Sequence, residues 1–489
     1  MIREDVGRPM SNTTIKHLLL IGSVACAFLF LAIHGEASAE ARAQANPGQP
    51  LSAEQRRAKA IFKELVETET THSTGDTSLA AQRMAKHLLD AGFPKEDVQV
   101  ITNAPRKGNL VARYRSPAPT QKPILFLAHI DVVEANPEDW NLPPFEFIEQ
   151  DGYYYGRGTI DDKDEAAIAV ANFITLKESG FVPNRDIIIA LTADEEGGEE
   201  NGVVYLLEHH RELVDAAFVI NEGGGGSLRA GKPVGNSVQA AEKVYQSYTL
   251  EVTNRGGHSS LPRSDNAIYS LVRALGAIEQ YQFPVQLNEV TRAYFSALRQ
   301  TMSGRDEKAM QRLLKNPADE KAAARFAEQP AINSRLRTTC VATQLDAGHA
   351  ENALPQRASA TVNCRILPGV PPADVQSQLA QLVSDPEVSI TALRPPTPSP
   401  ASPLSEDVMA PIMQITEEIW PGTPVVPIMS TGATDGLFFR NAGIPVYGVS
   451  GVFSDIDDVR AHGRDERIGV AEFFDGLVFQ RRLIEAFAR

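Results

Sequence analysis

Three apolar segments that alternate with helical patterns constrain the fold of this chain more than any other feature. Residues 123–133 (PILFLAHIDVV), 186–193 (DIIIALTA) and 216–221 (AAFVIN) are short apolar runs, as expected of strands that are buried on both faces of a parallel sheet. Residues 163–180 and 201–213, which lie between them, have helical patterns. Strands and helices in this order predict βαβ units, so we expect an α/β domain with a doubly wound, mainly parallel sheet.

A different pattern begins after residue 239. Residues 245–257 alternate like a half-exposed strand, residues 266–281 are typical of a helix, and residues 291–328 form a long helical segment. Antiparallel strands together with helices predict an inserted α+β domain. The Pro/Ser-rich residues 394–407 are predicted to be a hinge back to the first domain.

Two cysteines lie in two further predicted strands of this region, residues 338–348 and 356–369. If these strands pair antiparallel about Asn352, the residue numbers of any two opposed residues add up to the same value. Cys340 and Cys364 satisfy this condition and therefore face each other. Opposed residues of an antiparallel pair lie at a distance that a disulfide can span. We therefore expect a Cys340–Cys364 disulfide.

The N-terminus has the pattern of a secretory signal peptide. Basic residues precede the apolar residues 18–33, and the small residues Ala37 to Ala39 follow as a cleavage site. We expect residues 1–39, with Cys26, to be removed and the protein to be periplasmic or secreted, with no stable membrane anchor after cleavage. The alternative is an uncleaved N-terminal anchor.

The composition excludes some classes of partner. The chain has 489 residues, of which 43% are hydrophobic and 22% charged, and this balance is ordinary for a soluble protein of two or three domains. Its formal net charge of −15 does not favour binding to nucleic acid or to anionic lipid.

Imidazole and carboxylate side chains gather where the three apolar segments end. They are His129 and Asp131 in the first, Glu195 and Glu196 after the second, Glu222 after the third, and Asp161 and Asp162 in the glycine loop before residues 163–180. Taken singly, they have ordinary explanations, such as a His–Asp hydrogen bond, a helix N-cap or a solvated acidic turn. Together they lie at the sheet edge where α/β proteins bind ligands.

Carboxylates that converge in this way repel one another unless cations lie among them. A mixture of Asp, Glu and His suits zinc, manganese or cobalt better than calcium. Two such ions need a bridging carboxylate, terminal ligands on each side and a water between them. The side chains at this edge are sufficient for such a site.

The order of the motifs along the chain resembles the M20 family of metallopeptidases, which includes carboxypeptidases, dipeptidases, aminoacylases and deacylases. The motifs are HID, GRGTIDDK, TADEEGG, NEGG, GGHSSLP, NALPQRASATVNCRILPG, GATDG and AHGRDE. The likeness runs from about residue 51 to the C-terminus. It implies a catalytic domain in two parts, residues 40–239 and 396–489, and an inserted lid or dimerisation domain at residues 240–395.

The resemblance also implies a role for each residue of the metal site. His129 binds one of two divalent ions, most typically zinc, and Glu222 completes that side. Asp161 bridges the ions, while Glu196 and His462 bind the other one. Asp131 orients His129, as its position two residues along the strand also indicates. Glu195 does not touch metal and serves as the general base.

Further positions are implied for substrate binding. His258, from the inserted domain and commonly from the partner subunit of a homodimer, reaches the developing oxyanion. Asn352 and Arg365 bind substrate, with Arg365 as a clamp for a carboxylate, and Gly432, Thr434 and Asp435 form a glycine loop near the substrate. One departure from the family pattern is Asp164, which replaces the usual glycine and suits a helix start.

These residues predict hydrolysis of an amide bond next to a free carboxylate, by a carboxypeptidase or dipeptidase. The alternative within the family is an N-acyl-amino-acid amidohydrolase, which differs in the group on the amine side of the bond. A non-catalytic metal-binding or peptide-binding protein on the same fold is the third possibility. It is disfavoured because the predicted base and ligands are all present.

Overall fold

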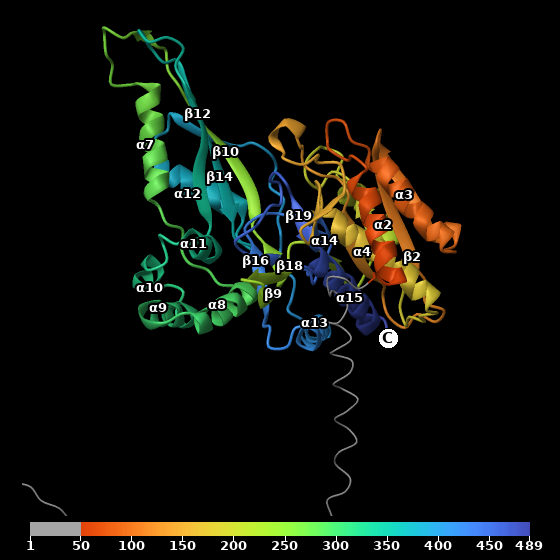
Figure 1. Cartoon of the computed structure of the whole chain (residues 1–489). Coiled ribbons are helices and arrows are strands. Elements are labelled where there is room, and N and C mark those ends of the chain that lie inside the picture. Colours follow the sequence, from red (N-terminus) through yellow and green to blue (C-terminus); the bar gives the residue numbers. More distant parts are fainter. Residues whose placement is uncertain (1–49) are drawn as a thin grey trace, which may run out of the picture. The chain divides into compact units, whose positions relative to one another are not determined.

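The computed structural model describes residues 50–489, so the predicted signal peptide and Cys26 lie outside the described residues. All described residues belong to one compact unit. Its main element is a ten-stranded mixed sheet (Figure 1). In spatial order the strands are β1 (Val98–Ala104), β2 (Lys107–Tyr114), β6 (Ile187–Thr192), β3 (Ile124–His129), β7 (Val219–Asn221), β17 (Val446–Gly448), β9 (Lys232–Glu242), β8 (Gly226–Arg229) and β18 (Phe453–Asp455), and β16 (Val425–Ser430) also pairs with β9.

The centre of this sheet is parallel, as the sequence predicted. Strands β6, β3, β7 and β17 run parallel to one another. The flanking pairs β1–β2, β2–β6, β17–β9 and β9–β8 are antiparallel. Because neighbouring central strands are parallel, their carboxyl ends meet at one edge of the sheet.

Helices cover both faces of the large sheet. On β3, Phe126 and Ala128 belong to one buried cluster, whereas Leu125 and Leu127 belong to another. This division follows from the alternation of side chains along a strand. The helices of the first cluster are α2 (Ala53–Val66), α3 (Thr77–Asp90), α4 (Lys163–Glu178), α13 (Glu406–Ile419) and α15 (Val470–Phe487), and those of the second are α5 (Gly202–His209), α6 (Arg211–Val214) and α14 (Gly436–Asn441).

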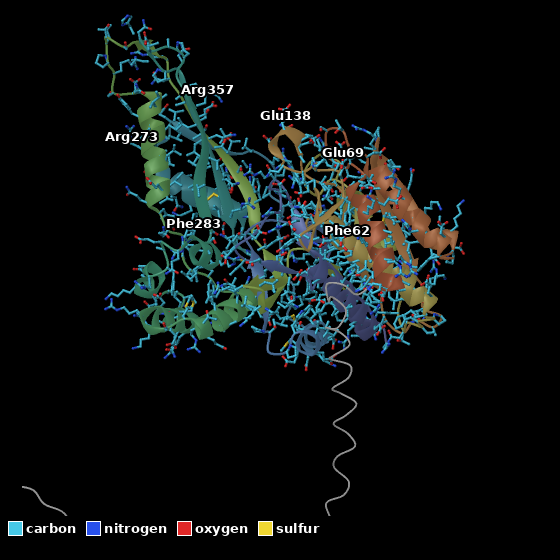
Figure 2. The ribbon with its side chains drawn as sticks, in the orientation of Figure 1. Phe62, Glu69, Glu138, Arg273, Phe283 and Arg357 are labelled. Carbon is cyan, nitrogen blue, oxygen red and sulfur yellow. A yellow bond between two sulfur atoms is a disulfide. The ribbon has the colours of Figure 1, made fainter. Side chains whose placement is uncertain are left out.

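The N-terminal helix α2 begins at a capping box. The Ser52 side chain accepts a hydrogen bond from the backbone of Gln55, whose side chain accepts one from the backbone of Ser52. Phe62, further along the helix (Figure 2), is fully buried. Its ring stacks on that of Phe473 in α15, with the ring centres 4.7 Å apart. The two ends of the described chain therefore share one core.

A small antiparallel sheet also joins distant parts of the chain. It consists of β4 (Ile148–Gln150), β5 (Tyr153–Tyr155) and β19 (Arg467–Gly469), and Arg467 is paired with Tyr155. The sequence did not predict it. It brings the segment that contains His462 next to the glycine loop that contains Asp161.

A second, wholly antiparallel sheet lies in the inserted region. Its order is β12 (Thr339–Ala347), β14 (Arg357–Ile366), β10 (Val244–Thr253) and β15 (Val388–Ala392). Figure 1 shows α7 (Ala267–Gln280) and α12 (Pro372–Val383) beside these strands, and they share a buried core with them. The predicted α+β character is therefore confirmed.

The predicted disulfide is present. Cys340 is paired with Cys364 in the register of β12 and β14, and the two sulfur atoms are bonded, with the Cα atoms 4.0 Å apart (Figure 2). The expected register holds from Thr339 to Ala342, after which a bulge shifts it by one residue. The connection is also more than a turn, because it contains β13 (Ala353–Leu354), which pairs with β11 (Gly257–His258).

The long helical segment is divided. It forms α8 (Glu289–Thr301), α9 (Gly304–Lys315) and α10 (Glu320–Ala324), and α11 (Pro330–Leu336) follows. The first break lies at Gly304, whose φ of +62° suits glycine, and the second lies next to Pro317. Val290 of α8 belongs to the core of the large sheet, so this segment does not pack with the inserted sheet alone.

The exact domain boundaries stay predictions. Strand β9 continues to Glu242 in the large sheet, three residues beyond the expected boundary at 239, and β10 of the second sheet begins at Val244. None of the helices within residues 50–489 combines the length and the apolar character needed to cross a membrane.

Candidate metal centre

His129 is the last residue of β3 and is 2% exposed. Its Nδ1 atom lies 3.1 Å from the backbone oxygen of Asp131, and its Nε2 atom lies 3.0 Å from Oδ1 of Asp161. The ring is therefore fixed through one nitrogen and directed at a carboxylate through the other. This is the arrangement that a metal-binding histidine needs.

The position of Asp131 differs from the expected one. Strand β3 ends at His129, so the two side chains are not held by strand geometry. The carboxylate oxygens of Asp131 instead accept hydrogen bonds from the backbone N–H groups of Glu195 (3.1 Å) and Glu196 (3.0 Å). Asp131 thus contacts Nδ1 of His129 through its backbone oxygen, and its Oδ1 atom lies 3.7 Å from the same nitrogen. The carboxylate also fixes the tip of β6.

Asp161 lies between two histidines. Its Oδ1 atom is 3.0 Å from Nε2 of His129, and its Oδ2 atom is 3.1 Å from Nε2 of His462. The Asp161–Asp162 peptide bond is cis. Asp162 precedes α4 but does not cap it through its side chain, which accepts a hydrogen bond from the backbone N–H of His129. The capping explanation for this pair is therefore wrong.

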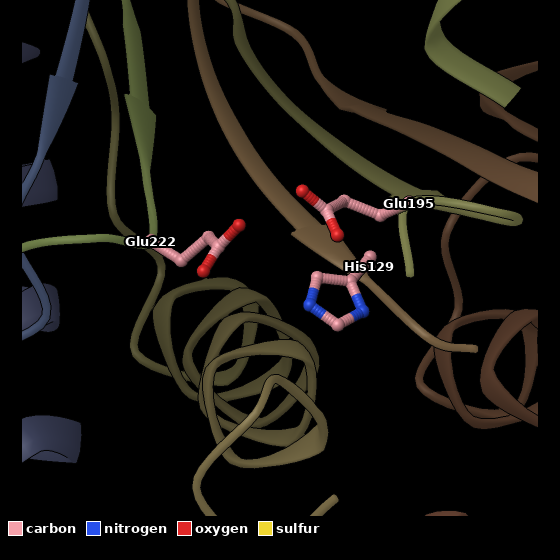
Figure 3. A group of neighbouring side chains, drawn as sticks. All are labelled: His129, Glu195 and Glu222. Carbon is pink, nitrogen blue, oxygen red and sulfur yellow. The ribbon is translucent and has the colours of Figure 1, made fainter. Parts of the chain in front are cut away.

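The remaining carboxylates come from the ends of β6 and β7. Oε1 of Glu196 lies 2.8 Å from Nε2 of His462. Figure 3 shows the carboxylates of Glu195 and Glu222 beside the ring of His129. Two groups have ligand atoms within 4.8 Å of one another, one formed by His129, Asp161 and Glu196 and the other by His129, Glu195 and Glu222. All five predicted metal ligands and the predicted base therefore lie together.

Burial raises the pKa values of several carboxyl groups in this cluster. It raises the pKa of Glu222 to about 8, and the charges of Asp161 and Asp435 add to the rise. Burial also raises the pKa of Glu195 well above its ordinary value and that of Asp435 to about 7. Burial is therefore the main cause of these raised pKa values, and the negative charges of neighbouring carboxylates add to it.

The pKa values of the two histidines are also raised, but by neighbouring carboxylates and not by burial. A hydrogen bond with Asp161 raises the pKa of His462 to about 9. Burial lowers the pKa of His129, but Asp161, Glu195 and Asp131 more than offset this effect and hold it well above the ordinary value. Burial raises the pKa of Asp161, yet both histidines together hold it below its usual range. The site therefore favours positive charge at its centre.

These donors fit divalent metal ions. Imidazole nitrogens and carboxylate oxygens are ligands of zinc, manganese and cobalt, and ions among them compensate the charges that now raise the carboxyl pKa values. The carboxylate of Asp161 faces a different histidine with each of its oxygens, as a bridging ligand does. These residues therefore fit divalent metal ions in charge and in ligand type.

The comparison with known families decides the assignment. The model of the family described as "Peptidase family M20/M25/M40" matches residues 125–486 of this chain. The chain belongs to this family. It is 31% identical over 379 residues to the N-fatty-acyl-amino acid synthase/hydrolase PM20D1 of Homo sapiens, covering 75% of this chain and 74% of that one. It is 29% identical over 411 residues to the probable carboxypeptidase S-like 2 of Dictyostelium discoideum, covering 81% and 78%.

Solved structures of the M20 family share the fold. The M20 family metallo-carboxypeptidase Sso-CP2 from Sulfolobus solfataricus superimposes with a TM-score of 0.64 at 19% identity, covering 88% of this chain and 99% of that one. The family match and the relatives confirm the prediction of an M20-type, metal-dependent hydrolase. The solved structure supports the predicted α/β fold, whose large sheet is mixed.

The glycine loop of this M20 chain lies next to the metal site. Asp435 is 3% exposed and accepts a hydrogen bond of 2.6 Å from Nδ2 of Asn201, near the tip of β6. Gly432 donates its backbone N–H to the side chain of Ser430. Arg365 reaches the same loop, because its Nη1 atom donates to the backbone oxygen of Thr431 at 3.3 Å.

Sequence reasoning missed the residue that anchors this loop. Glu242, the last residue of β9, is fully buried and accepts hydrogen bonds of 3.0 Å from the backbone and the hydroxyl of Thr434. Nη1 of Arg440 lies 3.1 Å from its other oxygen. Like Glu195, Glu242 is a carboxylate at the end of a strand, but β9 was not predicted because its sequence mixes apolar with polar residues.

The structure does not bring two other predicted residues to the metal site. His258 is exposed, and its Nδ1 atom accepts a hydrogen bond from the backbone N–H of Ser260. It lies beside Asn352, whose backbone oxygen accepts from Ser259 at 3.0 Å. Within residues 50–489 no hydrogen bond or ion pair joins His258 or Asn352 to a predicted metal ligand.

Asp164, where the family pattern has glycine, lies in the first turn of α4 as expected. It is nevertheless buried, and burial raises its pKa to about 8. The residue is thus part of the buried acidic surroundings of the metal site and affects more than the start of a helix.

Proposed function

We propose that this protein is a two-metal amidohydrolase that cleaves an amide bond next to a free carboxylate, with N-acyl amino acids as its substrates. A carboxypeptidase or dipeptidase activity is the second candidate. The observation that carries the proposal is the position of Asp161, whose two oxygens face His129 and His462 at 3.0 and 3.1 Å, with Glu196 and Glu222 close by.

Each predicted ligand has a place in this arrangement. Asp161, Glu196 and His462 form the set for one ion, and Asp161, His129 and Glu222 form the set for the other. The short separations of Glu196 and Asp161 from His462 support the first set. Zinc is proposed because histidine and carboxylate ligands suit it, and manganese or cobalt ions take the same donors.

When bound, the ions supply Lewis acidity, which polarises the scissile carbonyl group and lowers the pKa of a water molecule. Glu195 then acts as the general base. Its carboxylate accepts the proton of the attacking water and passes it to the leaving nitrogen. The backbone N–H groups of Glu195 and Glu196 are fixed on Asp131, so the base is held in place while its side chain stays free to exchange the proton.

Arg365 is proposed to bind the substrate carboxylate. Its guanidinium group is partly exposed, lies 4.6 Å from the centre of the Tyr245 ring, and has no carboxylate partner within residues 50–489. Burial lowers its pKa from a high ordinary value, and an anionic substrate group would offset that cost. The contact with Thr431 sets it beside the glycine loop that contains Gly432 and Thr434.

The relatives favour the acyl substrate. The chain is 31% identical to a human protein named as an N-fatty-acyl-amino acid synthase/hydrolase and 29% identical to a probable carboxypeptidase S-like protein. Both names describe chemistry at an amide next to an amino-acid carboxylate. What differs is the group on the other side of the bond, which is a fatty acyl chain in the first case and a peptide in the second.

A panel of matched substrates tests the proposal. Mature protein is loaded with zinc, manganese or cobalt and given N-dodecanoyl-phenylalanine, its C-terminal amide, and the dipeptide alanyl-phenylalanine. We expect the free acid to be cleaved faster than its amide by about two orders of magnitude or more, since the carboxylate is what the site recognises. Faster cleavage of the dipeptide would favour the second candidate, and no cleavage with any of these ions would contradict both.

We further propose a homodimer, in which His258 of one subunit reaches the oxyanion in the site of the other. The exposed position of His258 supports this proposal, as does the edge strand β12, on which Val341 and Leu345 are 55% and 61% exposed. Two apolar side chains on an unpaired strand edge are suited to contact with a second copy.

We also propose export to the periplasm or the exterior, with cleavage after residue 39. The Cys340–Cys364 disulfide supports this localisation, because disulfides persist in oxidising compartments and are rare in the cytosol.

A further inference from the structure

A buried ion pair lies between the two segments that supply Asp161 and His462. Arg157 belongs to the glycine loop before α4, and Glu466 lies just before β19. Their side chains are 3% and 0% exposed, and Nη1 of Arg157 donates to Oε2 of Glu466. Breaking a pair this deeply buried leaves an uncompensated charge, so the pair fixes its two segments relative to each other.

Each member of the pair also holds the backbone of the opposite segment. Oε1 of Glu466 accepts a hydrogen bond of 3.0 Å from the backbone N–H of Ile160, the residue before Asp161. Nη2 of Arg157 donates to the backbone oxygen of His462 at 3.3 Å. The contacts therefore cross over, and each reaches a predicted metal ligand or its direct neighbour.

The segment that contains His462 needs such support. His462 and Asp465 have φ values of +61° and +51°, in the left-handed region that residues other than glycine rarely adopt. A strained backbone of this kind persists only where surrounding contacts hold it. The Asp465 carboxylate supplies a further contact, because Oδ1 accepts the backbone N–H of Asn141 at 2.9 Å.

We propose that the Arg157–Glu466 ion pair is a positioning device for the metal centre, which holds Asp161 and His462 at ligand separation before an ion binds. His462 Nε2 and Asp161 Oδ2 are 3.1 Å apart although the residues are 301 positions apart in the chain (462 − 161). Preorganised ligands bind an ion more tightly because no free energy is spent on ordering them. Arg157 and Glu466 thus act through the ligands and do not touch substrate.

Metal affinity, measured without substrate, tests this inference independently of the proposed reaction. Metal-free mature protein is titrated with zinc in competition with a chromophoric chelator. We expect Glu466→Gln to weaken the affinity of at least one site by about 10- to 100-fold, as loss of a contact that supports a ligand typically does. Arg157→Lys keeps the charge but loses the forked geometry that serves Glu466 and His462 together, so we expect a smaller loss in the same direction.

The matched control is Asp186→Asn. Asp186 forms a partly buried ion pair with Arg113 at 3.0 Å, just before β6 and thus at the opposite end of that strand from Glu195. This variant is expected to lose thermal stability while its zinc affinity stays within about twofold of the wild type, a change too small to count as loss of a supporting contact. Zinc affinity is read only from variants whose circular dichroism matches the wild type.

Weaker zinc binding by both Glu466→Gln and Arg157→Lys, but not by Asp186→Asn, would support the inference. If Glu466→Gln does not fold, Arg157→Lys alone decides. Unchanged zinc affinity in the folded variants would overturn the positioning role and leave the pair a purely structural one. A wild-type protein that binds no zinc would contradict the metal centre itself, and this inference with it.

Discussion

At the scale of single residues, the structure shows how two adjacent carboxylates reach different neighbours. Glu195 and Glu196 both donate their backbone N–H groups to the carboxylate of Asp131, which fixes the turn after β6. The side chains then diverge, Glu196 to His462 and Glu195 to the space beside His129 and Glu222. The apolar strands predicted that His129, Glu195, Glu196 and Glu222 gather here, whereas His462 was expected only from the family resemblance. The hydrogen bonds of Asp131 were not predicted.

The role of Glu195 leads to the first prediction. Glu195→Gln keeps the shape of the side chain and removes its ability to accept a proton. We expect kcat to fall by about 10²- to 10⁴-fold, the range typical of general bases. The metal content, measured by inductively coupled plasma mass spectrometry, should stay unchanged. Glu199→Gln, an exposed position in the same turn, is the control and should retain activity. Substantial turnover by Glu195→Gln would refute the assignment.

The pKa shifts of His462 and Glu222 predict how stability depends on pH. Their pKa values rise to about 9 and about 8, from ordinary values of 6.5 and 4.5. A group whose pKa is higher in the folded state contributes stability that is complete below the unfolded value and is lost as pH rises through the folded value. The metal-free protein should therefore become less stable between about pH 5 and about pH 9.

Thermal denaturation of metal-free protein across that range measures the effect. Added zinc should raise the Tm more at high pH than at low pH, because metal ligands bind in their deprotonated forms. Glu222→Gln removes one titrating group and should make the pH dependence of the metal-free protein less steep. A Tm of the metal-free wild type that rises from about pH 5 to about pH 9 would contradict these pKa shifts.

At the scale of elements, the strands that end at the metal site were predictable and their antiparallel neighbours were not. Strands β3 and β6 are apolar up to their last residues, His129 and Thr192, which identifies them directly from the sequence. Strands β8 and β9 contain glycine, proline and polar residues, so their place in the sheet depends on β16, β17 and β18, which come from far along the chain. Glu242 was missed for this reason.

The disulfide between β12 and β14 is the first test at this scale. Protein that begins after residue 39, and so lacks Cys26, should contain no free thiol when it is denatured without reductant. Two titratable thiols would refute the bridge. Changing both Cys340 and Cys364 to alanine should lower the free energy of unfolding by about 3 kcal/mol, as the chain-entropy account gives for a loop with the observed sequence separation of 24.

The exposed edge of β12 provides the second test. Replacing Val341 and Leu345, which lie on β12 and are more than half exposed, with lysine should dissociate the proposed homodimer, since charges on an edge strand oppose edge-to-edge pairing. Sedimentation velocity measures the change, and kcat should fall with it because His258 is proposed to act across the interface. Val182→Lys, at another exposed valine, is the control. A wild-type protein that sediments as a monomer would contradict the proposal.

At the scale of the whole molecule, the metal site depends on contacts between the two ends of the chain. His462 approaches Asp161 because β19 pairs with β5, and α15 packs on α4 and α2 in the same core. No local pattern in the sequence predicts these contacts. The ordered motifs nevertheless located the residues, because membership of the M20 family already implies where the distant segments meet.

The measurement that tests the account most directly is the number of divalent ions bound per chain. Mature wild-type protein and the variant Asp161→Ala are saturated with zinc and freed of excess ion. The zinc content per chain is then measured by inductively coupled plasma mass spectrometry. If Asp161 bridges two ions, the wild type will hold two zinc ions per chain and Asp161→Ala will hold at most one. A wild type with fewer than two ions, or an Asp161→Ala variant that still holds two, would contradict the bridged centre.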